Sequence, residues 1–99
     1  MKVTLKEHTH VVYQKTTHEI KVEIDGVEYI IRNSEDDNGV EYFVWSENLN
    51  DGNWINPYDI ENIELKNIIE KLANAAYDDY IFSESKVGKE VNVDELNDY

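Results

Sequence analysis

The chain has 99 residues, which fits one domain, and its 40% hydrophobic content with eleven aromatic side chains favours a folded core over disorder. It contains no cysteine, which excludes a disulfide, a thiolate nucleophile and a zinc–cysteine site. Nine basic and 22 acidic residues give a net charge of −13, and the charge is uneven: residues 1–21 carry +2 and the other 78 residues carry −15.

The sequence shows no targeting or membrane segment. Its first residues lack the apolar stretch of a signal peptide, and no apolar run approaches the ~20 residues that span a bilayer. We therefore expect a cytoplasmic protein that does not bind membranes. Asn, Ile, Lys and Tyr are frequent while Arg, Ala and Pro are scarce, a bias typical of low-GC bacteria and their phages.

Residues 1–15 favour extended structure. Val3 and Leu5 alternate with polar residues, and 11–13 are two valines and a tyrosine, which are residue types enriched in strands. We expect one or two short strands here, the second running through a bulge at 14–16 into the strand that follows.

A hairpin over 17–32 organises the chain. Apolar and polar side chains alternate on both sides of Asp25-Gly26, and this dipeptide is a strong signal for a type I′ turn. The predicted pairs are Ile24–Val27, Val22–Tyr29 and Ile20–Ile31 on the buried face, and Glu23–Glu28, Lys21–Ile30 and Glu19–Arg32 on the other face. The pair of glutamates indicates that this second face is in contact with water.

A third strand over 40–45 is expected to return antiparallel after a turn at Asn38-Gly39. Val40, Tyr42 and Val44 share one face of this strand. On the other face, Phe43 and Trp45 join Ile30 in an apolar patch. We expect the N-terminal segment or the C-terminal tail to cover this patch; the alternative is that the patch binds a partner.

A helix is predicted over 60–82, after a loop that Trp54, Ile55 and Tyr58 anchor to the core. Asn56-Pro57, Asp59 and Asn62 each offer a helix start. The stripe that faces the sheet is Leu65, Ile68, Ile69, Leu72, Ala76 and Tyr80. Asp78 and Asp79 conflict with the helix dipole at the far end, and such conflicts sometimes mark function.

The C-terminal residues 90–93 alternate and predict a short edge strand, while 94–99 are expected to fray. Together the elements predict an α+β fold, in which an antiparallel sheet of three to five strands carries one long helix on one face. The whole chain, 1–99, is expected to form this single domain.

The sequence carries no motif for catalysis or for a cofactor. His8, His10 and His18 can approach one another on a sheet, but no carboxylates with ligand spacing accompany them, so we expect no metal site. The turn at 34–39 resembles a calcium loop only superficially, because Trp45 stands where the bidentate glutamate belongs. Without a phosphate loop or a nucleophile elbow, we expect a protein that is not an enzyme and has no cofactor.

The charge is the main indication of function. Phosphate would repel this chain, which disfavours direct nucleic-acid binding. The charge favours an inhibitor, monomeric or homodimeric, that presents carboxylates where phosphates lie and enters the basic groove of a nuclease or another nucleic-acid-binding protein. The candidate partner-binding residues are Glu35, Asp36, Asp37, Asp78, Asp79, Glu84, Glu90, Asp94, Glu95 and Asp98.

In size, charge and expected architecture, the chain resembles small acidic phage inhibitors such as anti-CRISPR and anti-restriction proteins, and also nuclease-toxin immunity proteins. The resemblance implies a DNA-mimic mode of inhibition. The alternative is an accessory interaction module or a toxin-immunity protein that binds through the patch of Ile30, Phe43 and Trp45 or through an open sheet edge.

Overall fold

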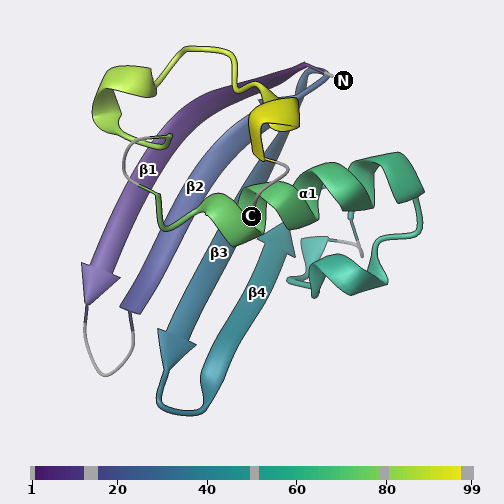
Figure 1. Ribbon diagram of the computed structural model, residues 1–99. Coiled ribbons are helices and arrows are strands. Elements are labelled where there is room, and N and C mark those ends of the chain that lie inside the picture. Colours follow the sequence, from purple (N-terminus) through teal and green to yellow (C-terminus); the bar gives the residue numbers. More distant parts are fainter. Residues whose placement is uncertain (1, 13–15, 50–51, 79–80, 97–99) are drawn as a thin grey trace.

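The computed structural model describes residues 2–12, 16–49, 52–78 and 81–96, apart from the side chains of 10–12 and 84. Within this part of the chain, strands β1 (Val3–Val12), β2 (Thr16–Ile24), β3 (Val27–Asp36) and β4 (Gly39–Trp45) precede helix α1 (Ile63–Ala75) (Figure 1). Short 3-10 helices, η2 (Pro57–Asp59), η3 (Glu84–Lys86) and η4 (Val93–Leu96), lie before and after α1. The predicted α+β class is confirmed.

The strands form one antiparallel sheet in the order β1-β2-β3-β4. All six pairs predicted between β2 and β3 are present, from Glu19–Arg32 to Ile24–Val27. Asp25 has φ +50° and Gly26 has φ +86°, the positive values that a type I′ turn requires at both central residues. The hairpin register was therefore predictable from the turn and the alternation of side chains.

The N-terminal residues form one ten-residue strand, whereas shorter pieces were expected. The bulge in β1 lies between Leu5 and Glu7, and the part of the predicted bulge at 14–15 lies outside the described residues. The edge strand predicted at 90–93 is reduced to a single bridge between Thr4 and Glu90, with backbone hydrogen bonds from 88–91 to β1 on either side of it. This segment covers the start of the β1 edge, from Val3 to Leu5.

Helix α1 is shorter than the predicted 60–82. The Asn62 side chain accepts a hydrogen bond from the Leu65 amide at 3.1 Å and caps the helix, while Asn56-Pro57 starts the separate turn η2. At the other end, the amides of Ala76 and Asp78 bond to carbonyls three residues earlier, which tightens the chain and ends the helix. The predicted contact of Tyr80 lies outside the described residues.

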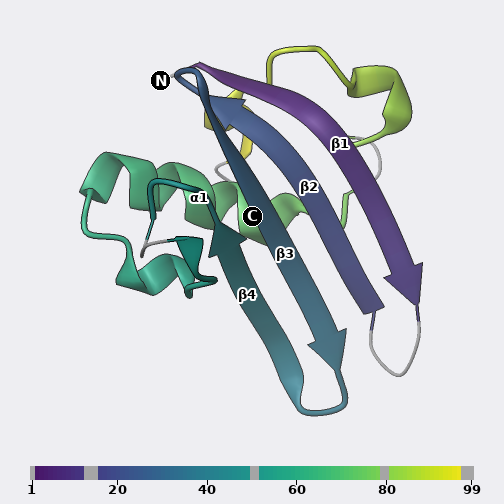
Figure 2. The same cartoon turned by 180° about the vertical axis from the view of Figure 1, so that it is seen from behind.

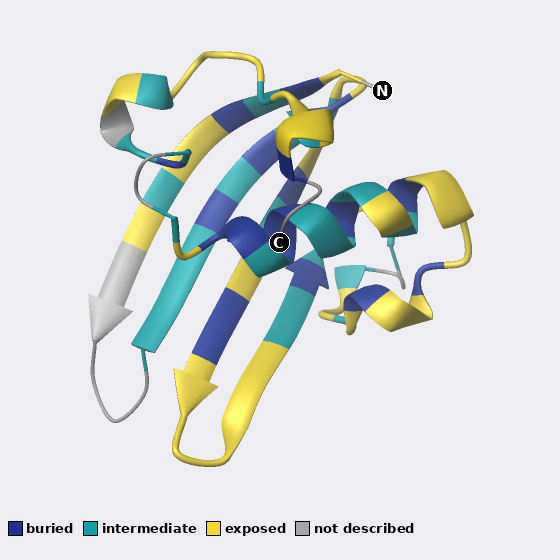
Figure 3. Ribbon diagram, viewed as in Figure 1, coloured by how far each residue is buried: buried dark blue, intermediate teal, exposed yellow. Residues whose placement is uncertain are grey.

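The core lies between one face of the sheet and α1 (Figure 3). Ile20, Val22 and Ile31 of the sheet pack with Ile69 and Leu72 of the helix, and all five are fully buried. The C-terminal segment closes the same core with two further buried side chains, Phe82 and Leu96. Within 94–99, where the sequence predicts fraying, residues up to Leu96 belong to η4, and 97–99 lie outside the described residues.

The sheet extends past the helix. None of the described helices lies on the outer face of the sheet (Figure 2), and the β3–β4 turn projects beyond α1 at one end (Figure 1). Ile55 bonds to both backbone groups of Val44 and covers that point of the β4 edge. Along 39–43, no described residue bonds to the outward backbone groups of β4, so this part of the edge is open. Among the described helices, none has the length and apolar character that a membrane span requires.

Tyr29 makes the stability of the fold sensitive to alkaline pH. Burial, and secondarily the charge of Asp25, raise the pKa of the Tyr29 phenol above its ordinary 10.0. Because the folded state holds the phenol proton more tightly than the unfolded state does, the protonated phenol stabilises the fold. This stabilisation is fully present below pH 10 and is lost as the pH rises through the pKa of the folded state. We expect urea unfolding to show a falling free energy of unfolding above pH 10 and a shallower fall in Tyr29→Phe. Equal slopes in the two proteins would contradict this assignment.

Candidate functional site

The outer face of the sheet holds paired charges. Arg32 donates to Glu19 at 2.6 Å, Lys6 lies 3.5 Å from Glu23, and Lys21 bridges Glu7 at 3.7 Å and Glu28 at 3.4 Å. The two glutamates raise the pKa of Lys21 above its ordinary value, Glu7 more than Glu28. The like-charge pair Glu23–Glu28 is tolerated because each glutamate lies near a different lysine, Glu23 near Lys6 and Glu28 near Lys21.

Most of the net charge of the chain lies on residues outside these ion pairs. The seven ion-paired residues carry four carboxylates and three cations, a net charge of −1, so −12 of the chain's −13 comes from other residues. Surface ion pairs of this kind contribute little to stability. Their main consequence is therefore the electrostatic asymmetry of the molecule.

The end of the β3–β4 hairpin, residues 35–41, is called the hairpin arm below. All seven of its residues are exposed, and four of them are acidic: Glu35, Asp36, Asp37 and Glu41. No described cation forms an ion pair with these carboxylates. The Asp36 side chain accepts the Asn38 amide at 2.8 Å, which holds the turn. A strand rise of ~3.3 Å per residue places the four acids within about 10 Å, a length over which duplex DNA, with one charge per ~1.7 Å, carries about six.

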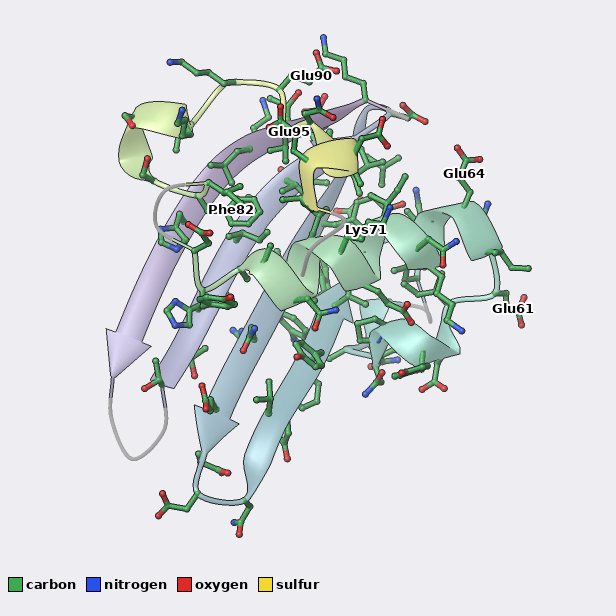
Figure 4. The ribbon with its side chains drawn as sticks, viewed as in Figure 1. Glu61, Glu64, Lys71, Phe82, Glu90 and Glu95 are labelled. Carbon is green, nitrogen blue, oxygen red and sulfur yellow. The ribbon has the colours of Figure 1, made fainter. Side chains whose placement is uncertain are left out.

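A second acidic region lies at the opposite end of the sheet. Glu90 and Glu95 lie together on the C-terminal segment, and Glu61 and Glu64 lie at the start of α1 (Figure 4). A cleft of 670 Å³ separates these two elements. It is lined by Glu64, Asn67, Ile68, Lys71, Glu90, Val91, Asn92, Val93 and Asp94.

The structure therefore divides the predicted site residues into separate groups. Glu35, Asp36 and Asp37 lie on the hairpin arm, while Glu90, Asp94 and Glu95 lie near the beginning of β1. The ten residues of β3 separate the two ends by ~30 Å at the usual strand rise. Sequence reasoning missed Glu41 on the arm and Glu64 in the cleft; the alternation of β4 offered a signal for Glu41.

Asp78 belongs to neither acidic group. Its carbonyl accepts the amides of Ile81 and Phe82, and its carboxylate accepts the Ile81 amide at 3.3 Å. The helix has already ended, so the expected conflict with the helix dipole does not arise, and Asp78 instead holds a turn. Asp79 and Asp98 lie outside the described residues, as does the side chain of Glu84.

The alternative patch is partly covered by the loop that follows β4. Ile30, Phe43 and Trp45 are half-buried, and the Trp45 indole donates to the Gly52 carbonyl at 2.7 Å. Next to the patch, the Arg32 guanidinium lies 4.3 Å from the centre of the Trp54 ring. The predicted cover by either end of the chain was wrong, because the C-terminal segment packs on the helix side.

The structure also corrects the prediction of which residues anchor the loop after β4. Ile55 packs on the core as predicted, but Trp54 and Tyr58 are exposed, Tyr58 to 74%. The register places His8 and His18 on the helix side of the sheet and pairs the backbone of His10 with that of His18. In the described part of the chain, no three side chains of His, Cys, Asp or Glu are grouped so that they could hold a metal ion.

Comparison of the chain with protein-family models, curated proteins and solved structures finds no match. The geometry and the charge of the molecule therefore provide the indications of its function.

Proposed function

We propose that the protein is a non-enzymatic inhibitor that binds a basic nucleic-acid-binding protein, such as a nuclease, by presenting carboxylates in place of phosphates. The observation that carries the proposal is the hairpin arm: seven consecutive exposed residues with four carboxylates, none ion-paired to a described cation. A groove that holds nucleic acid is basic, and an acidic arm gains both attraction and electrostatic steering there.

The arm is a better candidate for this role than the acidic cleft. The arm projects beyond α1, so it can enter a groove, whereas the cleft is concave (Figure 1). Lys71 lies among the acids of the cleft, and Lys86 and Lys89 line a smaller neighbouring cavity of 180 Å³. These cations weaken the negative field at that end of the molecule.

Competition with DNA tests the proposal. The immobilised protein is incubated with host extract at low salt, and retained proteins are challenged with duplex DNA or with polyglutamate at equal charge. We expect DNA to release a basic protein that polyglutamate releases poorly, because both DNA and the arm occupy its groove. Retained proteins that resist DNA, or that leave equally with polyglutamate, would contradict the proposal.

A second candidate function is an accessory module or immunity protein that binds by strand addition. The open β4 edge along 39–43 favours this candidate, because its unpaired backbone groups can bond to an extended segment of a partner. Main-chain hydrogen bonds depend little on salt, whereas the inhibitor should lose its partner as ionic strength rises. The salt dependence of binding therefore separates the two candidates.

A further inference from the structure

A small pocket lies where α1, β4 and the turn η2 meet. Its volume is 100 Å³, the space of about three liquid water molecules. It is lined by Tyr42, Asn56, Pro57, Tyr58, Glu70, Ala73 and Asn74. The pocket combines two aromatic rings with one carboxylate and two amides, so most of its polar groups can accept hydrogen bonds.

Glu70 contributes a buried acceptor to this pocket. Its Oε1 atom is shielded from solvent and has no hydrogen-bond donor among the described residues. The Asn74 side chain donates to the Glu70 backbone carbonyl at 3.0 Å, which commits the Asn74 amide nitrogen and leaves its oxygen as an acceptor. Glu70 as a whole is half-buried, and an acceptor atom without a donor favours a ligand that supplies an N–H group beside it.

The aromatic wall of the pocket favours a cation. The face of a tyrosine ring attracts positive charge, and the Lys66 ammonium already lies 5.2 Å from the centre of the Tyr58 ring. Tyr58 itself is 74% exposed, so its ring is accessible to a partner. Tyr42, on β4, is half-buried at the side of the pocket.

We infer that this pocket receives an arginine side chain of the basic partner; the inference rests on the proposed function for the existence of that partner. A guanidinium group is planar, stacks on aromatic rings and carries five N–H donors, which match the carboxylate and amide oxygens here. The arm would supply long-range attraction, and the pocket would fix one side chain of the bound partner.

Titration with a single amino acid derivative tests the pocket. N-acetyl-arginine methylamide is added to the labelled protein, and the NMR shifts of Asn56 and Asn74 are followed. The citrulline derivative, in which a urea replaces the guanidinium, serves as the neutral isostere. We expect arginine to bind about tenfold more tightly than citrulline, because hydrogen bonds to charged groups are the stronger ones.

The variant Glu70→Gln should lose about tenfold in arginine affinity, because it keeps the shape of the pocket but removes its charge. The matched control Glu64→Gln removes the same charge from an exposed position on the same helix and should change the affinity less than twofold. Circular dichroism checks that both variants fold. Equal affinities for arginine and citrulline, or equal effects of the two substitutions, would overturn the inference.

The pocket and the proposed function can fail separately. If DNA displaces the partner but arginine does not bind at Glu70, only the pocket is wrong. If arginine binds at Glu70 but DNA fails to displace the partner, the phosphate mimicry is wrong and the pocket stands.

Discussion

Neutralising the hairpin arm with Glu35→Gln, Asp36→Asn, Asp37→Asn and Glu41→Gln will weaken capture of the basic partner by about 100-fold, within the range that electrostatic attraction and steering provide. The four substitutions change the net charge from −13 to −9 and keep the side-chain shapes. Asn at 36 retains the oxygen that accepts the Asn38 amide, so the turn should persist. Binding is measured by surface plasmon resonance at several salt concentrations.

The matched control removes four exposed charges elsewhere: Glu47→Gln, Asp59→Asn, Glu61→Gln and Glu64→Gln. It also reaches −9 but leaves the arm intact, so it should weaken binding much less than the arm variant does. The free energy of unfolding of both variants should stay within about 0.5 kcal/mol of that of the natural chain, because exposed substitutions usually change it little. If the two variants bind equally, only total charge matters, and the directed role of the arm is wrong.

Replacing Phe82 by Ala will destabilise the protein by ~3–5 kcal/mol, the usual cost of a fully buried phenylalanine. This is a large share of the ~5–15 kcal/mol that stabilises a typical domain. Phe82 packs between the sheet and the C-terminal segment (Figure 4), and that segment holds β1 through the bonds of Gly88, Lys89 and Val91. Denaturant unfolding measures the loss.

Hydrogen exchange shows which part of the structure is destabilised in Phe82→Ala. The amides of Leu5 and Val91, which bond between β1 and the C-terminal segment, should exchange faster than those in the centre of β2 and β3. Val87→Ala is the control, because Val87 lies in the same segment and is 42% exposed. A loss below 1 kcal/mol in Phe82→Ala, or an equal loss in Val87→Ala, would show that Phe82 does not anchor the segment.

The central hairpin was predictable because local and tertiary preferences agree. Asp25-Gly26 favours the turn, and a one-residue slip of register would move Ile20, Val22 and Ile24 to the wet face. The helix end was not predictable in the same way. The apolar spacing continues past Ala75, and the stop depends on the local turn at Asp78 and on the burial of Phe82, which is a tertiary contact.

The candidate site likewise contains parts that the sequence predicts and parts that it does not. The acids at 35–37 were predictable, since a turn between two alternating strands must be exposed. The cleft and the Glu70 pocket each join segments that are distant in the sequence, and no local pattern indicates which loop packs on which turn of the helix. The histidines differ from the cleft and the pocket. Their spacing in the sequence suggested that they approach one another, and the register places His10 and His18 opposite each other.

Because the β4 edge is open, the carboxylates of the hairpin arm also affect aggregation. A bare strand edge is a template on which copies of a protein aggregate, and charged side chains along the edge are a common protection. Here the acids beside 39–43 would force like charges together if two edges met. Salt screens repulsion between exposed charges, so the protein should form β-rich aggregates at high ionic strength while its core stays folded.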